Sequence, residues 1–354
     1  MVSPNFRYTL CDFFSLTICI YFYERGLVNW QKKLAQGFSS ADALLAFLGL
    51  PPLLGCSAAE QQFKTRVPLG FAQRMQQGNP EDPLLLQVLA RPDELVEQPG
   101  FLQDPLCESI TNPLPGLLHK YHGRVLLTFV GACAVNCRYC FRRHFPYGDN
   151  NPGRSGWGSI FDYIRQDASI QEIILSGGDP LLATDLLLKE FVAELTTIKH
   201  VKILRFHTRI PVVLPERIDS SFLDFLSSVP LHKVIVLHCN HSQELNEEIK
   251  QICFAMKQAG CTLLNQSVLL RKINDNAITL AELSGHLFDC QILPYYLHVL
   301  DKVRGTSHFD IPDREIHAIY RTLQGLLPGY LVPRLVREIP GEISKSLLTN
   351  STLI

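Results

Sequence analysis

The chain has 354 residues, of which 46% are apolar and 19% are charged. This composition excludes an intrinsically disordered chain and provides enough apolar side chains for one large domain or two ordinary ones. The 33 basic and 34 acidic residues nearly cancel, which argues against a broad basic surface for nucleic acid and against an acidic tail.

An apolar run lies near the start of the chain, at residues 13–23. It is shorter than the roughly 20 residues that span a bilayer, and Asp12 lies at its edge. Only Arg7 precedes it, and no clear small-residue cleavage site follows. We therefore expect a helix of a cytoplasmic protein, or an extension upstream of the real start, with no membrane partner. A targeting segment is the alternative.

Residues 1–115 are predicted to form an N-terminal region that is mostly helical. Ser40 and Asp42 can cap a helix that Pro51 and Pro52 would end. Further prolines divide the rest into short pieces. These prolines are Pro80, Pro83, Pro92, Pro99 and Pro105.

From residue 124 onward, short apolar runs alternate with stretches of helical periodicity. The runs lie at 124–130, 171–175, 201–206, 233–238, 261–268 and 293–299. The helical stretches lie at 183–198, 242–259 and 276–290. This alternation predicts six βαβ-type units with a parallel sheet over residues 116–315, followed by a C-terminal segment over 316–354. An incomplete (β/α) barrel and a doubly wound sheet both fit, and in either fold the chemistry lies where strands end.

Three of the 11 cysteines, Cys133, Cys137 and Cys140, lie together just after the first of these runs. The other cysteines are scattered, which is typical of a reducing compartment. Three thiolates can hold three irons of a cubane cluster and leave the fourth iron open. Zinc is a weaker alternative because it needs a fourth ligand, for which His144 is the nearby candidate. The remaining alternative is that the three cysteines are buried or lie together by chance and bind no metal.

The second run ends in Ser176, Gly177, Gly178 and Asp179. Glycines at the end of a strand let a ligand approach the backbone closely. Taken alone, this segment could equally be a tight turn. Its place, one unit after the cysteines, favours a role at the same site.

A C-x3-C-x2-C segment at the end of the first strand of a (β/α)6 pattern resembles the radical S-adenosylmethionine enzymes. The resemblance implies an α/β fold, an incomplete (β/α)6 TIM-like barrel with an N-terminal helical extension and a short C-terminal segment. It also implies a [4Fe–4S] cluster on Cys133, Cys137 and Cys140, with S-adenosyl-L-methionine on the open iron. The segment 176–179 would then meet the methionyl amino group.

Within that superfamily, the chain resembles the lysine 2,3-aminomutase family over residues 60–350. The paired arginines after Cys140, the segments 207–218 and 264–270, and the tyrosine pair before Asp301 carry the likeness. The resemblance implies pyridoxal 5'-phosphate as a further cofactor. It makes Lys345 the lysine that binds this cofactor covalently, and Arg124 the arginine that holds its phosphate.

The same resemblance implies three substrate contacts. Arg142 would bind the α-carboxylate of L-lysine, because a planar guanidinium fits a carboxylate with two hydrogen bonds. Asp301 would hold the distal ammonium. Glu338 occupies the place of a second carboxylate, which is an aspartate in enzymes that act on free lysine, and its side chain is longer by one methylene.

Residues 297–305, and an end of the chain nine residues after Lys345, resemble the branch that makes (R)-β-lysine for translation elongation factor P. We therefore expect an isomerase that converts L-lysine to (R)-β-lysine. Its expected partners are a reducing electron donor and, through its product, an elongation factor P ligase. Nucleic acid is not expected as a partner, and a homo-oligomer is compatible with the sequence.

Three alternatives stay open at this point. The first is a free L-lysine 2,3-aminomutase of catabolic or secondary metabolism. The second is a radical enzyme that acts on a glutamate or arginine analogue. The third is a noncatalytic iron–sulfur or zinc-binding interaction protein.

Overall fold

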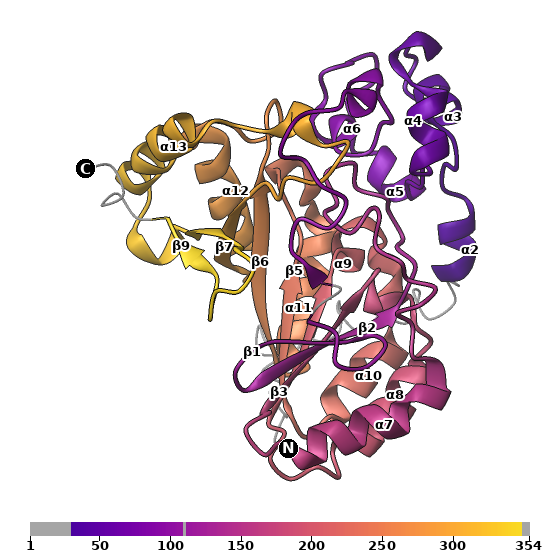
Figure 1. Ribbon diagram of the computed structural model, residues 1–354. Helices are drawn as coiled ribbons and strands as arrows, with labels where there is room; N and C mark the ends of the chain where they lie inside the picture. Colours follow the sequence, from indigo (N-terminus) through magenta and orange to yellow (C-terminus); the bar gives the residue numbers. More distant parts are fainter. Residues whose placement is uncertain (1–29, 109–110, 349–354) are drawn as a thin grey trace, which may run out of the picture.

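A computed structural model describes residues 30–108 and 111–348 (Figure 1). The apolar run at 13–23 lies outside the described residues. None of the helices in the described part of the chain combines the length and apolarity needed to cross a membrane.

In its described part, residues 30–108, the N-terminal region contains short helices joined by turns and loops, as its many prolines predict. They are α2 (Trp30–Ala35), α3 (Ala41–Phe47), η1 (Pro52–Leu54), α4 (Ser57–Gln62), α5 (Leu69–Ala72), α6 (Pro83–Leu86) and η2 (Pro92–Leu95). Ser40 caps α3 as expected, because its hydroxyl accepts a hydrogen bond from the backbone N–H of Ala43. Asp82 caps α6 in the same way and receives the N–H groups of Leu84 and Leu85.

A single sheet of nine strands follows, and its spatial order is its sequence order. The strands are β1 (Leu117–Tyr121), β2 (Arg124–Val130), β3 (Glu172–Gly177), β4 (Ile203–Thr208), β5 (His232–Leu237), β6 (Cys261–Leu269), β7 (Leu293–Val299), β8 (Arg334–Arg337) and β9 (Ser346–Leu347). Every neighbouring pair from β2 to β8 is parallel. β1 and β9 pair antiparallel at the two ends, so the barrel is not closed. The incomplete TIM-like barrel is confirmed.

All six strands expected from the sequence are present within a few residues of their expected bounds. The expected number was one too low, because β8 adds a seventh parallel strand from within the C-terminal segment. This strand has only four residues and gave no recognisable apolar run. The antiparallel strands β1 and β9 were not expected either.

Helices separate the parallel strands. They are α7 (Gly153–Gln166), α8 (Asp185–Leu195), α9 (Ile210–Val213), α10 (Ser220–Ser228), α11 (Glu247–Gln258), α12 (Ala277–Asp289) and α13 (Asp313–Leu326). The short 3-10 turns are η4 (Pro180–Leu182), η5 (Pro215–Arg217), η6 (Ser242–Glu244), η7 (Ser307–Phe309) and η8 (Gly329–Leu331). Along the outside of the sheet, α7 contacts α8, α8 contacts α10, and α10 contacts α11 (Figure 1). Further along the chain, α12 contacts α13.

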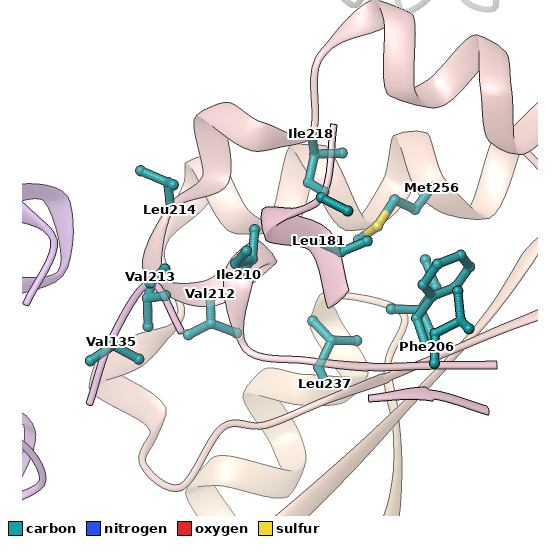
Figure 2. Packing of buried hydrophobic residues seen from close by; sticks show 14 of the residues in the cluster. Val135, Leu181, Phe206, Ile210, Val212, Val213, Leu214, Ile218, Leu237 and Met256 are labelled. Atoms are coloured by element: carbon teal, nitrogen blue, oxygen red, sulfur yellow. The ribbon is translucent and has the colours of Figure 1, made fainter. Parts of the chain in front are cut away.

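The main hydrophobic core lies between these helices and the sheet. β3 is buried at all six positions, as expected for a parallel strand covered on both faces. Phe206 and Leu237, near the ends of β4 and β5, are fully buried beside Leu181, Ile210 and Met256 (Figure 2). Full burial of such a side chain is worth about 1.5–3 kcal/mol. This packing fixes the strand ends, from which the site is built.

Candidate active site

A cavity of about 500 Å³ lies inside the open barrel and at the carboxyl ends of its strands. Every site residue expected from the sequence lines this cavity. They are Arg124, Cys133, Cys137, Cys140, Arg142, Ser176, Gly177, Gly178, Asp179, Asp301, Glu338 and Lys345. Residues separated by more than 200 positions therefore meet in one place, as a single site requires.

The N-terminal region fixes the loop that carries the cysteines. Arg138 is fully buried, and its Nε and Nη2 donate to the two carboxylate oxygens of Glu94 at 2.8 and 2.6 Å. Arg143 donates to the same carboxylate at 2.7 Å. The backbone N–H of Arg138 donates to the carbonyl of Gln87 at 2.8 Å. Glu94 and Gln87 were missed from the sequence, because nothing local to them indicates a partner in the cysteine loop.

The cysteines share one buried environment. Burial, with the nearby Cys137 as the next cause, raises the pKa of Cys140 to about 11. Burial, with Cys140 as the next cause, also raises the pKa of Cys133 well above its usual range. Among residues 30–108 and 111–348, no three His, Cys, Asp or Glu side chains lie close enough together to hold a single metal ion. The Nε2 of His144, the candidate fourth ligand in the weaker zinc alternative, lies 3.2 Å from the carbonyl oxygen of Arg304.

The turn after β3 packs directly on the cysteine loop. A Cβ on Gly178 would lie 2.2 Å from the carbonyl oxygen of Ala132, and one on Gly177 would lie 2.7 Å from that of Val130. Gly177 also has a φ of 111°, which disfavours any residue with a side chain. Both positions therefore require glycine for the approach of the two loops.

The carboxylate of Asp179 holds this end of the sheet together. It accepts hydrogen bonds from the hydroxyl of Thr208 (2.7 Å) and from the N–H groups of Leu181 (3.1 Å), Arg209 (2.8 Å) and Ile210 (3.2 Å). Four donors already occupy the side chain that the sequence assigned to a ligand. In this turn, the backbone rather than the Asp179 side chain is therefore left to contact a ligand.

Arg142 is held by an acidic partner. Its Nε and Nη2 donate to Glu108 at 2.7 and 2.8 Å, and its Nη1 donates to Ser176 at 3.2 Å. Burial alone would raise the pKa of Glu108, but Arg142 and Lys120 lower it. Two of the donors expected to bind a substrate carboxylate are therefore engaged by Glu108, which the sequence did not indicate.

Glu338 and Lys345, which also line the cavity, form an ion pair on the connection between β8 and β9. Lys120 donates to Glu338 at 2.9 Å and lies 3.3 Å from Glu108. Burial alone would raise the pKa of Glu338, but Lys345 and Lys120 lower it to about 2. Burial and the charge of Glu338 raise the pKa of Asp301 to about 7. Alternating charges therefore cross the cavity from Arg142 to Lys345.

Comparison with known proteins identifies the family. A family model described as "4Fe-4S single cluster domain" matches residues 121–258, which include all three clustered cysteines. The L-lysine 2,3-aminomutase of Escherichia coli (strain K12) is 48% identical over 323 residues, which is 90% of this chain and 94% of the relative. The chain belongs to the lysine 2,3-aminomutase family.

Two further relatives carry the same name. That of Haemophilus influenzae (strain Rd) is 47% identical over 90% of this chain and 95% of the relative. That of Clostridium subterminale is 38% identical over 74% of this chain and 63% of the relative. As a lysine 2,3-aminomutase family member, the chain is an isomerase. Its cofactors are a [4Fe–4S] cluster, S-adenosyl-L-methionine and pyridoxal 5'-phosphate, as the resemblance implied.

The residues of this family member fit those cofactors. In a cubane cluster each cysteine binds a different iron, so three thiols in one loop suit it. They do not have to surround a single metal ion. The guanidinium of Arg124 lies over the ring of Tyr121, 4.8 Å from its centroid, at the cavity wall. In the described part of the chain, the Nε2 of His207 is buried on the same wall without a hydrogen-bond partner. A ligand in the cavity would satisfy such a polar atom.

Proposed function

We propose that this protein converts L-lysine to (R)-β-lysine by moving the amino group from Cα to Cβ. One observation carries the proposal: a single cavity joins the cysteine loop and the Gly177–Gly178 turn to the pair formed by Glu338 and Lys345. The relatives named L-lysine 2,3-aminomutase support lysine as the substrate.

When bound, the cofactors supply hydrogen-atom abstraction and a conjugated system across which nitrogen can migrate. The chain positions them. Cys133, Cys137 and Cys140 would hold the cluster and leave one iron for S-adenosyl-L-methionine, which the turn at 176–179 would contact. Lys345 would bind pyridoxal phosphate covalently, and Arg124 would bind its phosphate. The buried cavity excludes water from these reactive groups.

The charges of the cavity match the two ends of lysine. Of the side chains that line the cavity, Arg142 would bind the α-carboxylate, and Asp301 and Glu338 would bind the distal ammonium. Glu338 pairs with the ammonium of Lys345. Once Lys345 is bound to the cofactor, the ammonium of the substrate can take its place. An acidic substrate would instead face two carboxylates.

We also propose that the (R)-β-lysine is used in the cytoplasm to modify elongation factor P through a separate ligase. The segments 297–305 and 341–345, which resemble that branch, support this proposal. If it is correct, cells without the gene carry unmodified elongation factor P, as measured by intact mass. Fully modified elongation factor P in such cells would instead favour the catabolic or secondary-metabolic alternative.

The enzymatic proposal is tested with the full chain, reconstituted anaerobically with iron, sulfide and pyridoxal phosphate. With S-adenosyl-L-methionine, reductant and L-lysine, chiral chromatography should detect (R)-β-lysine. L-Glutamate and L-arginine serve as alternative substrates and should give no β-amino acid. Lys345→Ala should form no product. Lys302→Ala is its matched control and should keep activity, because Lys302 is exposed, pairs with Asp310 and does not line the cavity. Turnover of glutamate but not of lysine would refute the proposal.

A further inference from the structure

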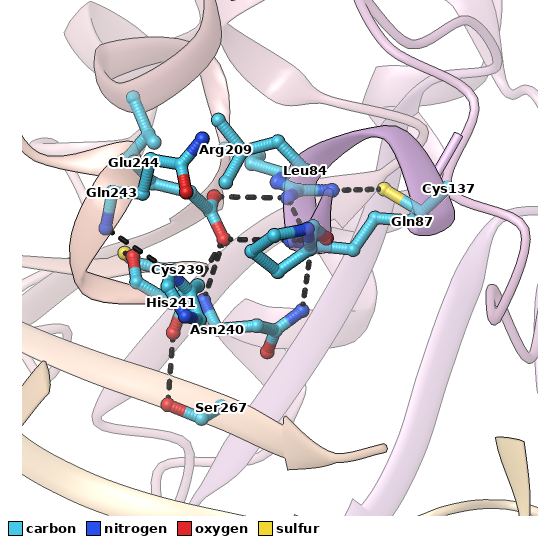
Figure 3. Close-up of polar contacts among 12 residues, drawn as sticks. Leu84, Gln87, Cys137, Arg209, Cys239, Asn240, His241, Gln243, Glu244 and Ser267 are labelled. Carbon is cyan, nitrogen blue, oxygen red and sulfur yellow. Dashed lines mark hydrogen bonds and ion pairs between the residues drawn. The ribbon is translucent and has the colours of Figure 1, made fainter. Parts of the chain in front are cut away.

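A buried arginine lies against one of the three clustered cysteines. Arg209 follows β4, and its Nη1 lies 2.8 Å from the Sγ of Cys137 (Figure 3). Its side chain is only 6% exposed. The backbone N–H of Arg209 donates to Asp179, which ties the same residue to the turn after β3.

Two side chains from other parts of the chain hold the guanidinium in this position. The Nη2 of Arg209, which is not the nitrogen that faces the sulfur, donates to Gln87 at 2.6 Å and to Glu244 at 2.9 Å. Gln87 lies at the end of α6, and Glu244 lies in η6 after β5. Gln87 also donates to Glu244 at 3.1 Å, so the two acceptors support each other.

This arrangement is itself anchored. Glu244 is fully buried, and its other oxygen accepts the backbone N–H groups of Asn240 (2.9 Å) and His241 (3.2 Å). Asn240 donates to Gln87 at 3.0 Å (Figure 3). A buried guanidinium is stable only when it is paired and hydrogen-bonded, and each acceptor here is fixed by further donors. The direction of the Nη1 group toward Cys137 is therefore set by the fold.

We propose that Arg209 is a positioning residue for the iron–sulfur cluster, and that its N–H donates to the Cys137 thiolate and makes the cluster easier to reduce. The inference rests on the proposed role of Cys137 as a cluster ligand. Hydrogen bonds to the sulfurs and nearby charge are among the factors that set the reduction potential of such clusters. Both a donor and a positive charge favour the reduced state, because it carries one more electron.

The test is the midpoint potential of the cluster in the reconstituted full chain, followed by electron paramagnetic resonance during redox titration. In Arg209→Gln, which removes the charge, we expect the ratio of reduced to oxidised cluster at a fixed potential to fall at least tenfold. For one electron, this corresponds to a potential lower by about 59 mV. In Arg209→Lys, we expect a smaller shift of the same sign, because one ammonium cannot span Cys137 and both acceptors.

Arg217→Lys is the matched control. Arg217 is also a fully buried arginine after β4, but it pairs with Asp185 (2.7 Å) and donates to the carbonyls of Leu181 and Ala183. The potential should not change in this variant. Iron and sulfide are measured in every sample before the redox titration. A wild-type chain that binds no cluster would contradict the proposed function as well as this inference.

Three results would overturn the inference itself. One is an unchanged potential in cluster-loaded Arg209→Gln or Arg209→Lys. Another is weaker binding of S-adenosyl-L-methionine with no change in potential, because Arg209 would then act on that ligand and not on the thiolate. The third is loss of the cluster from both Arg209 variants while Arg217→Lys retains it, because Arg209 would then only hold the loop together.

Discussion

Replacing Glu94 by glutamine tests how the N-terminal region fixes the cysteine loop. Glu94 is 3% exposed and is shared by two buried guanidinium groups. Arg138 and Arg143 both donate to its Oε2, at 2.6 and 2.7 Å. Glu94→Gln keeps the shape of the side chain but removes the charge, so both arginines lose their counter-ion.

The expected cost follows from burial. Removing one partner of a buried ion pair costs about 3–5 kcal/mol, because the remaining charge is left uncompensated. Arg138 keeps hydrogen bonds to the carbonyls of Phe63 (2.6 Å) and Ala59 (3.3 Å). We therefore expect the lower end of the range, a loss of about 3 kcal/mol in the free energy of unfolding.

Urea unfolding of the cofactor-free chain, followed by circular dichroism, measures this loss. The control is Glu190→Gln, which breaks the surface pair of Arg154 and Glu190, whose side chains are 58% and 41% exposed. Such pairs contribute about 0–1 kcal/mol, so the control should be almost neutral. We also expect Glu94→Gln to retain less iron after reconstitution. Equal losses in the free energy of unfolding of Glu94→Gln and Glu190→Gln would refute the reasoning.

Three further predictions concern the cavity. Cys137→Ala should abolish the iron–sulfur absorbance after reconstitution, whereas Cys56→Ala, outside the cavity, should retain it. Borohydride reduction of the pyridoxal-phosphate-loaded chain should leave a pyridoxyl group on Lys345, identified by peptide mass spectrometry, and a label on another lysine would contradict the assignment. Burial and the charge of Glu338 raise the pKa of Asp301 to about 7, so the folded chain keeps a proton there that the unfolded chain releases near pH 4. The part of the free energy of unfolding due to Asp301 should therefore fall as the pH rises from about 4 to about 7. Urea unfolding at a series of pH values should show this fall in the wild type and not in Asp301→Asn, and equal pH profiles would contradict it.

Short-range patterns predicted much of the fold and part of the site. The six apolar runs, the cysteine spacing and the Gly177–Gly178 turn are each encoded within a few neighbouring residues, and all of them lie where the sequence placed them. Lys345 has no such local signal, and only the family resemblance singled it out. Strand β8 was missed because four residues are too few to show a period.

The missed residues of the site act through long-range contacts. Glu108 lies 34 positions before Arg142, and Lys120 lies 218 positions before Glu338. Glu94 and Gln87 reach the cysteine loop from short helices whose sequence reads as ordinary surface or core. Ion pairs of this kind are set by the path of the chain in space, so they could not be read from local composition.

Transfer of the α-nitrogen of lysine to its β-carbon, without release as free ammonia, is the central claim, and isotope labelling tests it most directly. The reconstituted enzyme is given S-adenosyl-L-methionine, reductant and L-lysine labelled with ¹⁵N at the α-amino group, in the presence of unlabelled ammonium. We predict β-lysine that carries the whole label on Cβ, as read from fragment masses. Recovery of unchanged lysine, or of a β-amino group containing unlabelled nitrogen, would contradict the account.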